Sequence, residues 1–184
     1  MSDLMPFSAN TYIVLDVPSP TADQVMAVRQ HEQDDLRMAL PVEITVTGST
    51  GVGEIVSGQD PARVYTIVDQ IAAITPPIEA SFGPVRRVPQ TAIFVLTLTD
   101  ERPFHLLHHR FAESGIQFHP SPYPYAPHCT LRSRSPISEE EAARLLARRI
   151  DGAFVLTTLS VYMLDRLPCT LLHRVALSSA SEHA

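Results

Sequence analysis

Two side chains that could hold a phosphate and move a proton lie two residues apart in the segment His128-Cys129-Thr130-Leu131. Alternate residues of a strand point to the same face, so His128 and Thr130 would share one side. Cys129 and Leu131 would then form an apolar side that can pack on a core. An imidazole transfers protons near neutral pH, and a hydroxyl can donate to a phosphate oxygen. The segment fits phosphate chemistry, and it also fits an ordinary half-exposed strand that carries a histidine.

Two arginines follow His128 at the same even spacing. If the strand continues, Arg132 and Arg134 lie on the His128 face and attract a phosphate electrostatically. A turn before Pro136 would instead take Arg134 out of the strand. We therefore expect Arg132, and less directly Arg134, to bind substrate.

A second segment of the same kind lies eighty-five residues upstream, where Glu43-Ile44-Thr45-Val46 aligns with residues 128–131. Glu43 takes the position of the histidine, and Thr45 takes that of the threonine. A carboxylate can accept a proton, and it can donate one if burial raises its pKa. An ionised Glu43 would also repel a phosphodiester, so the segment leaves open whether this residue helps or hinders such chemistry.

With these two segments the chain resembles the 2H phosphoesterases, the family of the 2′-5′ RNA ligases and RNA 2′,3′-cyclic phosphodiesterases. The mark of that family is two copies of His-x-Thr/Ser-hydrophobic, one in each half of a pseudo-symmetric fold. Residues 128–131 match the second copy in full. Residues 43–46 match the first copy except at Glu43, where the family has a histidine.

The resemblance implies a bilobal α+β fold with two antiparallel sheets, flanking helices and a central groove between the motif strands. In the family one histidine is the general base and the other the general acid, while the two hydroxyls hold phosphate oxygens. These roles carry over to His128, Thr130 and Thr45, and Glu43 stands where the family has its other acid–base histidine. The resemblance implies neither a cofactor nor a metal. His105 and His109 have the spacing of a metal pair, but no third ligand is evident.

Three functions remain open at this stage. The first is a metal-independent phosphoesterase that acts on a nucleotide or RNA-end 2′,3′-cyclic phosphate or on a 2′-5′ linkage, weakened or respecialised by Glu43. The second is a non-catalytic module on the same fold that binds a nucleotide or an RNA end. The third is an unrelated α+β protein in which both strands are purely structural. In the first two, the expected partner is a nucleotide or RNA-end phosphate bound as a small ligand.

The composition sets limits on these alternatives. The 184 residues, of which 45% are hydrophobic and 18% charged, are typical of one globular domain covering residues 1–184. A net charge of −6 argues against bulk DNA binding. All 14 basic residues are arginines, which excludes a lysine adenylate of the classical ligase kind.

The sequence also suggests where the protein works. No apolar run reaches the roughly 18 residues of a membrane span, and residues 1–5 lack the features of a signal peptide. Cys129 and Cys169 are too few for a disulfide framework, so a reducing cytoplasm is expected. We expect a monomer that does not bind membranes.

Periodicity and turn residues predict an alternating order of elements. Strands are expected at 11–17, 43–47, 78–88, 92–99, 154–164 and 171–177, and around His128. Helices are expected at 22–35, from residue 61, at 103–114 and from residue 138. The motif lobes would cover about 36–90 and 116–165, with terminal strands completing the sheets. Residues 178–184 are expected to form a disordered tail.

Two connecting segments adjoin the motifs. Residues 116–127 contain four prolines within eight positions, which predicts a stiff linker that fixes the orientation of His128. Tyr123 and Tyr125 in this linker either stack on a nucleobase or pack against the sheet. The segment 48–54 has the glycine spacing of a phosphate loop, but Glu54 stands where such a loop needs lysine. We expect it to be a flexible loop that borders the groove.

Overall fold

Two four-stranded antiparallel sheets form the frame of the protein in the computed structural model, which describes residues 4–178. The first sheet has the strand order β2-β1-β7-β8, with β1 at Asn10–Asp16, β2 at Glu43–Thr47, β7 at Thr158–Leu164 and β8 at Thr170–Ala176. The second has the order β5-β4-β3-β6, with β3 at Ile78–Arg87, β4 at Phe94–Leu98, β5 at Cys129–Arg132 and β6 at Ala153–Leu156. The expected α+β class with two antiparallel sheets is therefore confirmed.

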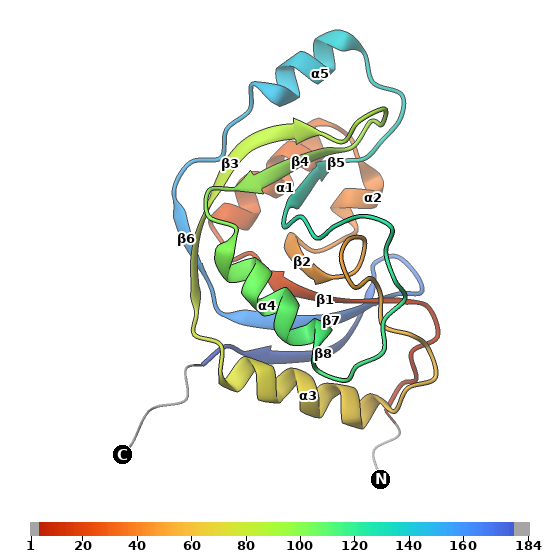
Figure 1. Ribbon diagram of the computed structural model, residues 1–184. Helices are drawn as coiled ribbons and strands as arrows, with labels where there is room; N and C mark the ends of the chain where they lie inside the picture. Colours follow the sequence, from red (N-terminus) through yellow and green to blue (C-terminus); the bar gives the residue numbers. More distant parts are fainter. Residues whose placement is uncertain (1–3, 179–184) are drawn as a thin grey trace.

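Helices flank both sheets (Figure 1). α3 (Pro61–Ala73) contacts β8, and α4 (Arg102–Ala112) contacts β2, so both cover the first sheet. α1 (Thr21–His31) and α2 (Asp35–Met38) contact β5, while α5 (Glu139–Leu146) contacts β3, so these three accompany the second sheet. Within residues 4–178, no helix has the length and hydrophobicity needed to cross a membrane.

The helix after the first strand is shorter than the sequence predicts. Residues 22–35 were expected to form one helix, but α1 ends at His31 and α2 begins at Asp35. Gln33 has a φ of 50°, a left-handed conformation that a continuous helix cannot contain. The Asp34 side chain then accepts a hydrogen bond from the backbone nitrogen of Arg37 at 3.0 Å and caps α2. This break directs α2 toward the end of β5.

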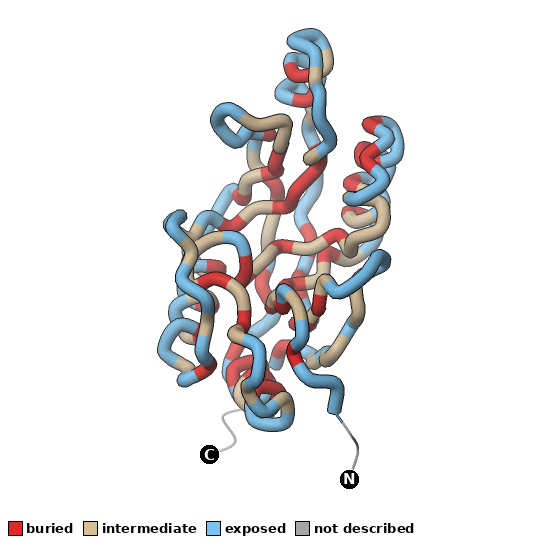
Figure 2. Tube along the Cα trace, turned by 90° about the vertical axis from the view of Figure 1, so that its right-hand side faces the viewer, coloured by how far each residue is buried: buried red, intermediate tan, exposed pale blue. Residues whose placement is uncertain are grey.

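The core lies between the sheets and under the helices, as the buried segments of Figure 2 show. Each motif strand contributes its apolar face to this core. Ile44 and Val46 of β2, and Cys129 and Leu131 of β5, are all 0% exposed. The apolar faces inferred from sequence are thus confirmed in both strands. On the opposite face of β5, Thr130 and Arg132 are also buried, at 7% and 2% exposed.

The segment 154–164 was expected to be one strand, and this prediction was wrong. β6 pairs with β3 in the second sheet, with Ile78 opposite Leu156. β7 pairs with β1 in the first sheet, with Val14 opposite Ser160. Thr157 separates the two strands, so the chain crosses from one sheet to the other at this residue.

Each sheet takes strands from distant parts of the chain. Residues 36–90 contribute β2 to the first sheet and β3 to the second, and residues 116–165 likewise contribute to both sheets. The predicted lobe ranges therefore do not coincide with the sheets. Ser178, in the expected tail, forms an isolated bridge with Thr75. The rest of that predicted tail, 179–184, lies outside the described residues.

Candidate active site

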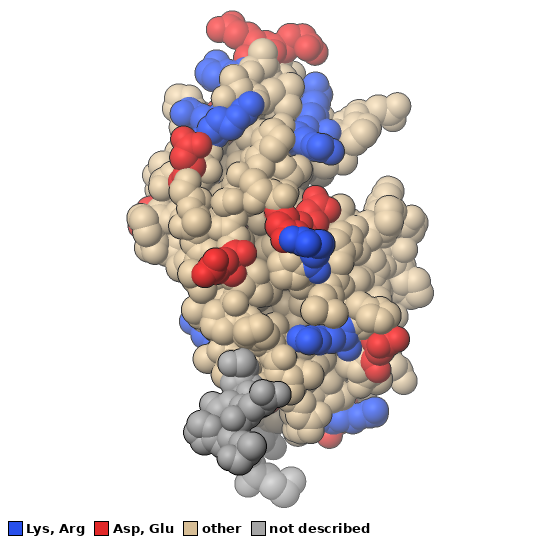
Figure 3. Space-filling model, turned by 60° about the vertical axis from the view of Figure 1, so that its left-hand side comes forward, with Lys and Arg blue, Asp and Glu red and all other residues tan. Residues whose placement is uncertain are grey.

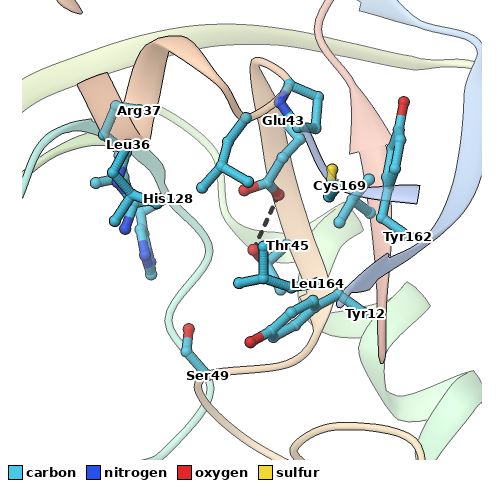
Figure 4. Close-up of a pocket in the computed structure, with 14 residues that line it drawn as sticks. Tyr12, Leu36, Arg37, Glu43, Thr45, Ser49, His128, Tyr162, Leu164 and Cys169 are labelled. Carbon is cyan, nitrogen blue, oxygen red and sulfur yellow. Dashed lines mark hydrogen bonds between the residues drawn. The ribbon is translucent and has the colours of Figure 1, made fainter. Parts of the chain in front are cut away.

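A pocket of about 190 Å³ opens where the edge strand of one sheet meets the edge strand of the other. β2 and β5 contact each other there. Side chains from both motif strands line the pocket together with residues of β1, α2, β7 and the neighbouring loops (Figure 4). The lining residues are Tyr12, Val14, Leu36, Arg37, Leu40, Pro41, Glu43, Thr45, Ser49, His128, Thr130, Tyr162, Leu164 and Cys169.

Glu43 and Thr45 reach the pocket from the same face of β2. The Thr45 Oγ1 hydroxyl donates a hydrogen bond to Glu43 Oε2 at 2.9 Å, the dashed line in Figure 4. Burial raises the pKa of Glu43 to about 6. The Thr45 hydrogen bond and the positive charges of Arg29 and Arg37 act in the opposite direction. Near neutral pH, Glu43 is therefore a carboxyl group that can exchange a proton.

His128 enters the pocket immediately before β5 begins. Its Nδ1 lies 2.7 Å from the carbonyl oxygen of Ala126. Because a carbonyl oxygen only accepts, Nδ1 carries the proton and Nε2 of the neutral ring keeps its lone pair. Burial lowers the pKa of His128 below its ordinary value. The ring is therefore neutral at pH 7, with a basic nitrogen that is not used by this hydrogen bond.

Thr130 completes the four motif residues in the pocket. It is 7% exposed, and its backbone is held by Arg29 of α1. Arg29 is itself 1% exposed and donates to the Thr130 carbonyl oxygen from Nε at 3.2 Å and from Nη2 at 2.8 Å. The structure thus brings Glu43, Thr45, His128 and Thr130 to one cavity.

The same arginine fixes the approach to β2. Its Nη1 donates to the carbonyl oxygens of Arg37, Leu40 and Pro41 at 2.9, 3.1 and 3.1 Å. Arg29 therefore connects the second motif strand to the segment that leads into the first. Nothing in the sequence around Arg29 distinguishes it from a solvent-exposed helix arginine, so Arg29 could not be predicted as a site residue.

Tyr125 supports the first motif strand from outside the pocket. Its ring stacks on His108 of α4, with centroids 3.9 Å apart and an angle of 5° between the planes. Its hydroxyl donates to the Thr45 carbonyl oxygen at 3.1 Å, and His108 Nδ1 donates to the Val46 carbonyl oxygen at 2.7 Å. Of the two alternatives for Tyr125, the geometry favours packing over base stacking. Tyr123 is 66% exposed and does not line the pocket.

Arg132 and Arg134 do not line the pocket, contrary to the expectation that they face the phosphate. Arg132 is 2% exposed, and its Nε lies 3.3 Å from Glu32 Oε2. Its two other nitrogens donate to the carbonyl oxygens of Arg134 and Pro136. Glu32 lies directly after α1, so the Arg132 guanidinium is paired with the end of a neighbouring helix. Strand periodicity cannot reveal such a partner. Arg134 is exposed at the end of the strand.

The loop after β2 borders the pocket, as expected, through Ser49. Gly48 permits the close approach between this loop and the aromatic side of the cavity. A Cβ atom at Gly48 would lie 2.4 Å from Tyr12 Cδ1 and 2.7 Å from Thr45 Cγ2. Tyr12 is in turn held by a hydrogen bond from its hydroxyl to Glu54 Oε1 at 3.1 Å. Glu54, the residue that argued against a nucleotide phosphate loop, thus orients a pocket side chain.

No group of three or more His, Cys, Asp or Glu residues within 4–178 is arranged to hold a metal ion. His105 and His109, which have the spacing of a metal pair, each face a glutamate one helical turn away. The distances are 3.5 Å between His105 Nε2 and Glu101 Oε2, and 3.3 Å between His109 Nε2 and Glu113 Oε2. The described residues therefore offer acid–base groups and hydroxyls at the pocket, and no metal cluster.

The sequence of the chain matches a family model described as the 2′-5′ RNA ligase superfamily over residues 17–167. The chain belongs to this superfamily. The matched range includes both motif strands and all the linkers between them. A comparison with curated protein sequences found no relative.

Solved structures support the same fold. The protein is similar to TT0787 of Thermus thermophilus, with a TM-score of 0.61 and 12% identity over 95% of this chain and 100% of the other. It is also similar to Escherichia coli LigT complexed with phosphate, with a TM-score of 0.59 and 12% identity over 94% of this chain and 98% of LigT. LigT complexed with 3′-AMP gives a TM-score of 0.59 and 14% identity over 94% and 99% of the two chains. The resemblance to the 2H phosphoesterases inferred from sequence is confirmed at the level of family and fold.

Proposed function

We propose that the protein is a metal-independent phosphoesterase that acts on a nucleotide or RNA-end 2′,3′-cyclic phosphate or on a 2′-5′ linkage. The observation that carries this proposal is the convergence of Glu43, Thr45, His128 and Thr130 on one pocket. Membership of the 2′-5′ RNA ligase superfamily and the phosphate and 3′-AMP complexes of LigT support the same substrate class. The small pocket fits a nucleotide or an RNA end better than a duplex. On the face shown in Figure 3, arginines and acidic residues are interspersed, and no broad basic patch is present.

In this proposal His128 is the general base. Its neutral ring offers the Nε2 lone pair to a water molecule, which attacks the phosphorus and transfers a proton to that nitrogen. The hydrogen bond from Nδ1 to Ala126 holds the ring in this tautomer and stabilises the imidazolium that forms. The stiff segment before His128 supplies the carbonyl, so the orientation depends on the backbone.

Glu43 is then the general acid. As the bond between phosphorus and the ribose oxygen breaks, the leaving oxygen takes a proton from the Glu43 carboxyl. A pKa of about 6 leaves a fraction of the carboxyl protonated near neutral pH, and a bound phosphate anion increases that fraction. The hydroxyls of Thr45 and Thr130 hold the non-bridging phosphate oxygens. Thr45 must turn its hydroxyl from Glu43 to the phosphate when substrate binds.

One observation favours the second candidate, a non-catalytic module that binds a nucleotide or RNA end. The Thr45 hydroxyl donates to Glu43 and is therefore not free for a phosphate in this state. If Glu43 stays ionised, it repels the anion and cannot donate a proton. The module would then bind its ligand through the side of the pocket that carries His128 and Thr130.

Hydrolysis assays separate the two functions. We expect wild type to hydrolyse adenosine 2′,3′-cyclic phosphate or a 2′-5′ adenylyl dinucleotide in the presence of EDTA. His128→Ala should lower kcat by about 10²- to 10⁴-fold, the contribution of one acid–base group. Glu43→His, which removes a negative charge and restores the family residue, should raise turnover by an order of magnitude or more, whereas Glu43→Gln should lower it. Wild-type turnover no faster than that of His128→Ala would refute the catalytic proposal and select the binding module.

A further inference from the structure

The four motif residues leave the pocket without a positive charge for its substrate. Glu43 is acidic, His128 is neutral at pH 7, and the two threonines are uncharged. Arg132 and Arg134, the expected phosphate ligands, lie outside the cavity. Among the described residues that line it, Arg37 is the single arginine, and the chain has no lysine. Figure 4 places Arg37 beside His128, across the pocket from Glu43.

The Arg37 guanidinium is held at one nitrogen and open at the other two. Nε donates to Ser133 Oγ at 3.0 Å, at the end of the second motif strand. Nη1 and Nη2 make no hydrogen bond to any of the residues that the structure describes, 4–178, and the side chain forms no ion pair with them. A guanidinium fixed at Nε presents its two Nη groups as a planar fork, which matches two oxygens of a phosphate.

The backbone under Arg37 is held in place before any ligand binds. Asp34 Oδ1 accepts from the Arg37 backbone nitrogen at 3.0 Å. Asp34 Oδ2 accepts from the backbone nitrogens of Ser133 and Arg134 at 2.6 and 2.9 Å. One carboxylate therefore joins α2 to the end of β5, and the fork has a fixed position relative to His128. Such preorganisation lowers the cost of ordering a side chain on binding.

The positive charge of Arg29 acts on Arg37 at this side of the pocket. Burial lowers the pKa of Arg37 and the Arg29 charge lowers it further, while the negative charges of Glu43 and Asp34 act in the opposite direction. Arg29 is not available to a ligand, because it is 1% exposed and its nitrogens all donate to backbone carbonyls. An anion at the Arg37 fork would offset the repulsion between the two guanidiniums.

We propose that Arg37 is the phosphate-binding residue of this site and that its Nη1 and Nη2 groups hold the non-bridging oxygens of a nucleotide phosphate. The proposal rests on the proposed function. It specifies which positively charged residue allows the pocket to bind an anion although Glu43 lines it. The ligand class is a nucleotide with a terminal or cyclic phosphate. A neutral nucleoside gains nothing from Arg37.

Calorimetric titration at low ionic strength tests the proposal, with adenosine 3′-monophosphate, inorganic phosphate and adenosine as probes. We expect Arg37→Met to weaken binding of the monophosphate by about 10- to 100-fold, the range for lost charge-assisted hydrogen bonds, and to leave adenosine binding unchanged. Arg37→Lys should recover part of the loss, because it keeps the charge without the fork. Arg144→Met, which removes an exposed arginine of α5, is the matched control for net charge and should bind like wild type.

The same titrations contain the results that would overturn the proposal. Unchanged monophosphate affinity in folded Arg37→Met, or an equal loss for adenosine, excludes Arg37 as a phosphate ligand. If the circular dichroism spectrum shows that Arg37→Met is unfolded, an NMR titration of the wild-type protein tests the proposal instead. The Nε–H NMR signal of Arg37, assigned with Arg37→Lys, should shift on titration with inorganic phosphate, and no shift refutes the assignment.

Turnover distinguishes this proposal from the proposed function. If wild type binds the monophosphate through Arg37 and hydrolyses nothing, the catalytic proposal fails and the Arg37 assignment stands. If Arg37→Met hydrolyses adenosine 2′,3′-cyclic phosphate with an unchanged KM, the Arg37 assignment fails and the catalytic proposal stands.

Discussion

Glu43→Gln should stabilise the protein at alkaline pH and not at acidic pH. The pKa of Glu43 rises from an ordinary value of 4.5 to about 6 in the folded protein, mainly because the carboxyl is buried. A raised carboxyl pKa means that ionised Glu43 destabilises the fold. The destabilisation is absent below the unfolded pKa and reaches its full size above the folded pKa.

The magnitude follows from the shift. A difference of 1.5 between the two pKa values, 6 minus 4.5, corresponds to about 2 kcal/mol at pH 8, at roughly 1.4 kcal/mol for each unit. This figure is an upper bound, because Glu43 is partly exposed where it lines the pocket. Glutamine keeps an acceptor for the Thr45 hydroxyl, so the hydrogen bond is retained and the charge alone is removed. For a chain of this size the change corresponds to an increase in Tm of roughly 4–8 °C.

Thermal unfolding of wild type and Glu43→Gln, followed by circular dichroism at pH 4 and pH 8, measures this effect. The Tm difference should be near zero at pH 4 and positive at pH 8. Glu79→Gln, which removes the same charge from an exposed residue of β3, is the control for net charge. A Tm difference that is equal at the two pH values, or a variant less stable than wild type at pH 8, would show that Glu43 is not a buried, raised-pKa carboxyl.

Two further substitutions test the contacts that hold the motif strands. Tyr125→Phe keeps the stack on His108 and removes the hydrogen bond to the Thr45 carbonyl. Urea titration should show that the free energy of unfolding falls by about 0.5–1.5 kcal/mol. An unchanged urea midpoint would contradict this hydrogen bond. Arg29→Met leaves buried carbonyls of both motif regions without a donor. We therefore expect the free energy of unfolding to fall by about 3–5 kcal/mol in the same titration. A loss below about 1 kcal/mol would refute the account of Arg29 as a structural connection.

Local patterns in the sequence predicted much of the fold. The strand at Glu43–Thr47 was predicted with its observed bounds, because alternation and the preceding proline both mark it. The helix that begins at Pro61 was predicted from Asp60, whose side chain accepts a hydrogen bond from the backbone nitrogen of Ala62 at 3.1 Å. Both signals lie within a few residues of the feature that they predict.

The prediction failed where the deciding partner is distant in the chain. Residues 154–164 are almost uniformly strand-forming, so their composition could not reveal that β6 pairs with β3 and β7 with β1. Arg132 lies in a strand, as its sequence spacing predicted, but its guanidinium binds Glu32, a hundred residues away in the chain. A burial of this kind depends on tertiary packing, which no local pattern encodes.

In the candidate site, too, local signals predicted some residues and missed others. The four motif residues share a pocket, as expected from the two aligned segments. Arg37 was missed because residues 22–35 were predicted to form one helix that ends before it. The short helix α2, which begins at Asp35 and carries Arg37, was therefore not predicted. The signal that could have found it is Asp34, an N-cap residue in the sequence Asp34-Asp35-Leu36-Arg37 that indicates a new helix start. Its neighbour Arg29 has no such signal.

The two motif strands belong to different sheets, so no ladder of backbone hydrogen bonds sets the distance between them. Within the described chain, side-chain contacts such as those of Arg29 set that distance instead. A backbone ladder has a fixed spacing, whereas the length of a bridging side chain differs from one amino acid to another. Substitutions on α1, which lies outside both sheets, can therefore widen or narrow the cavity. The width of the pocket can thus change without any substitution in residues 43–46 or 128–131.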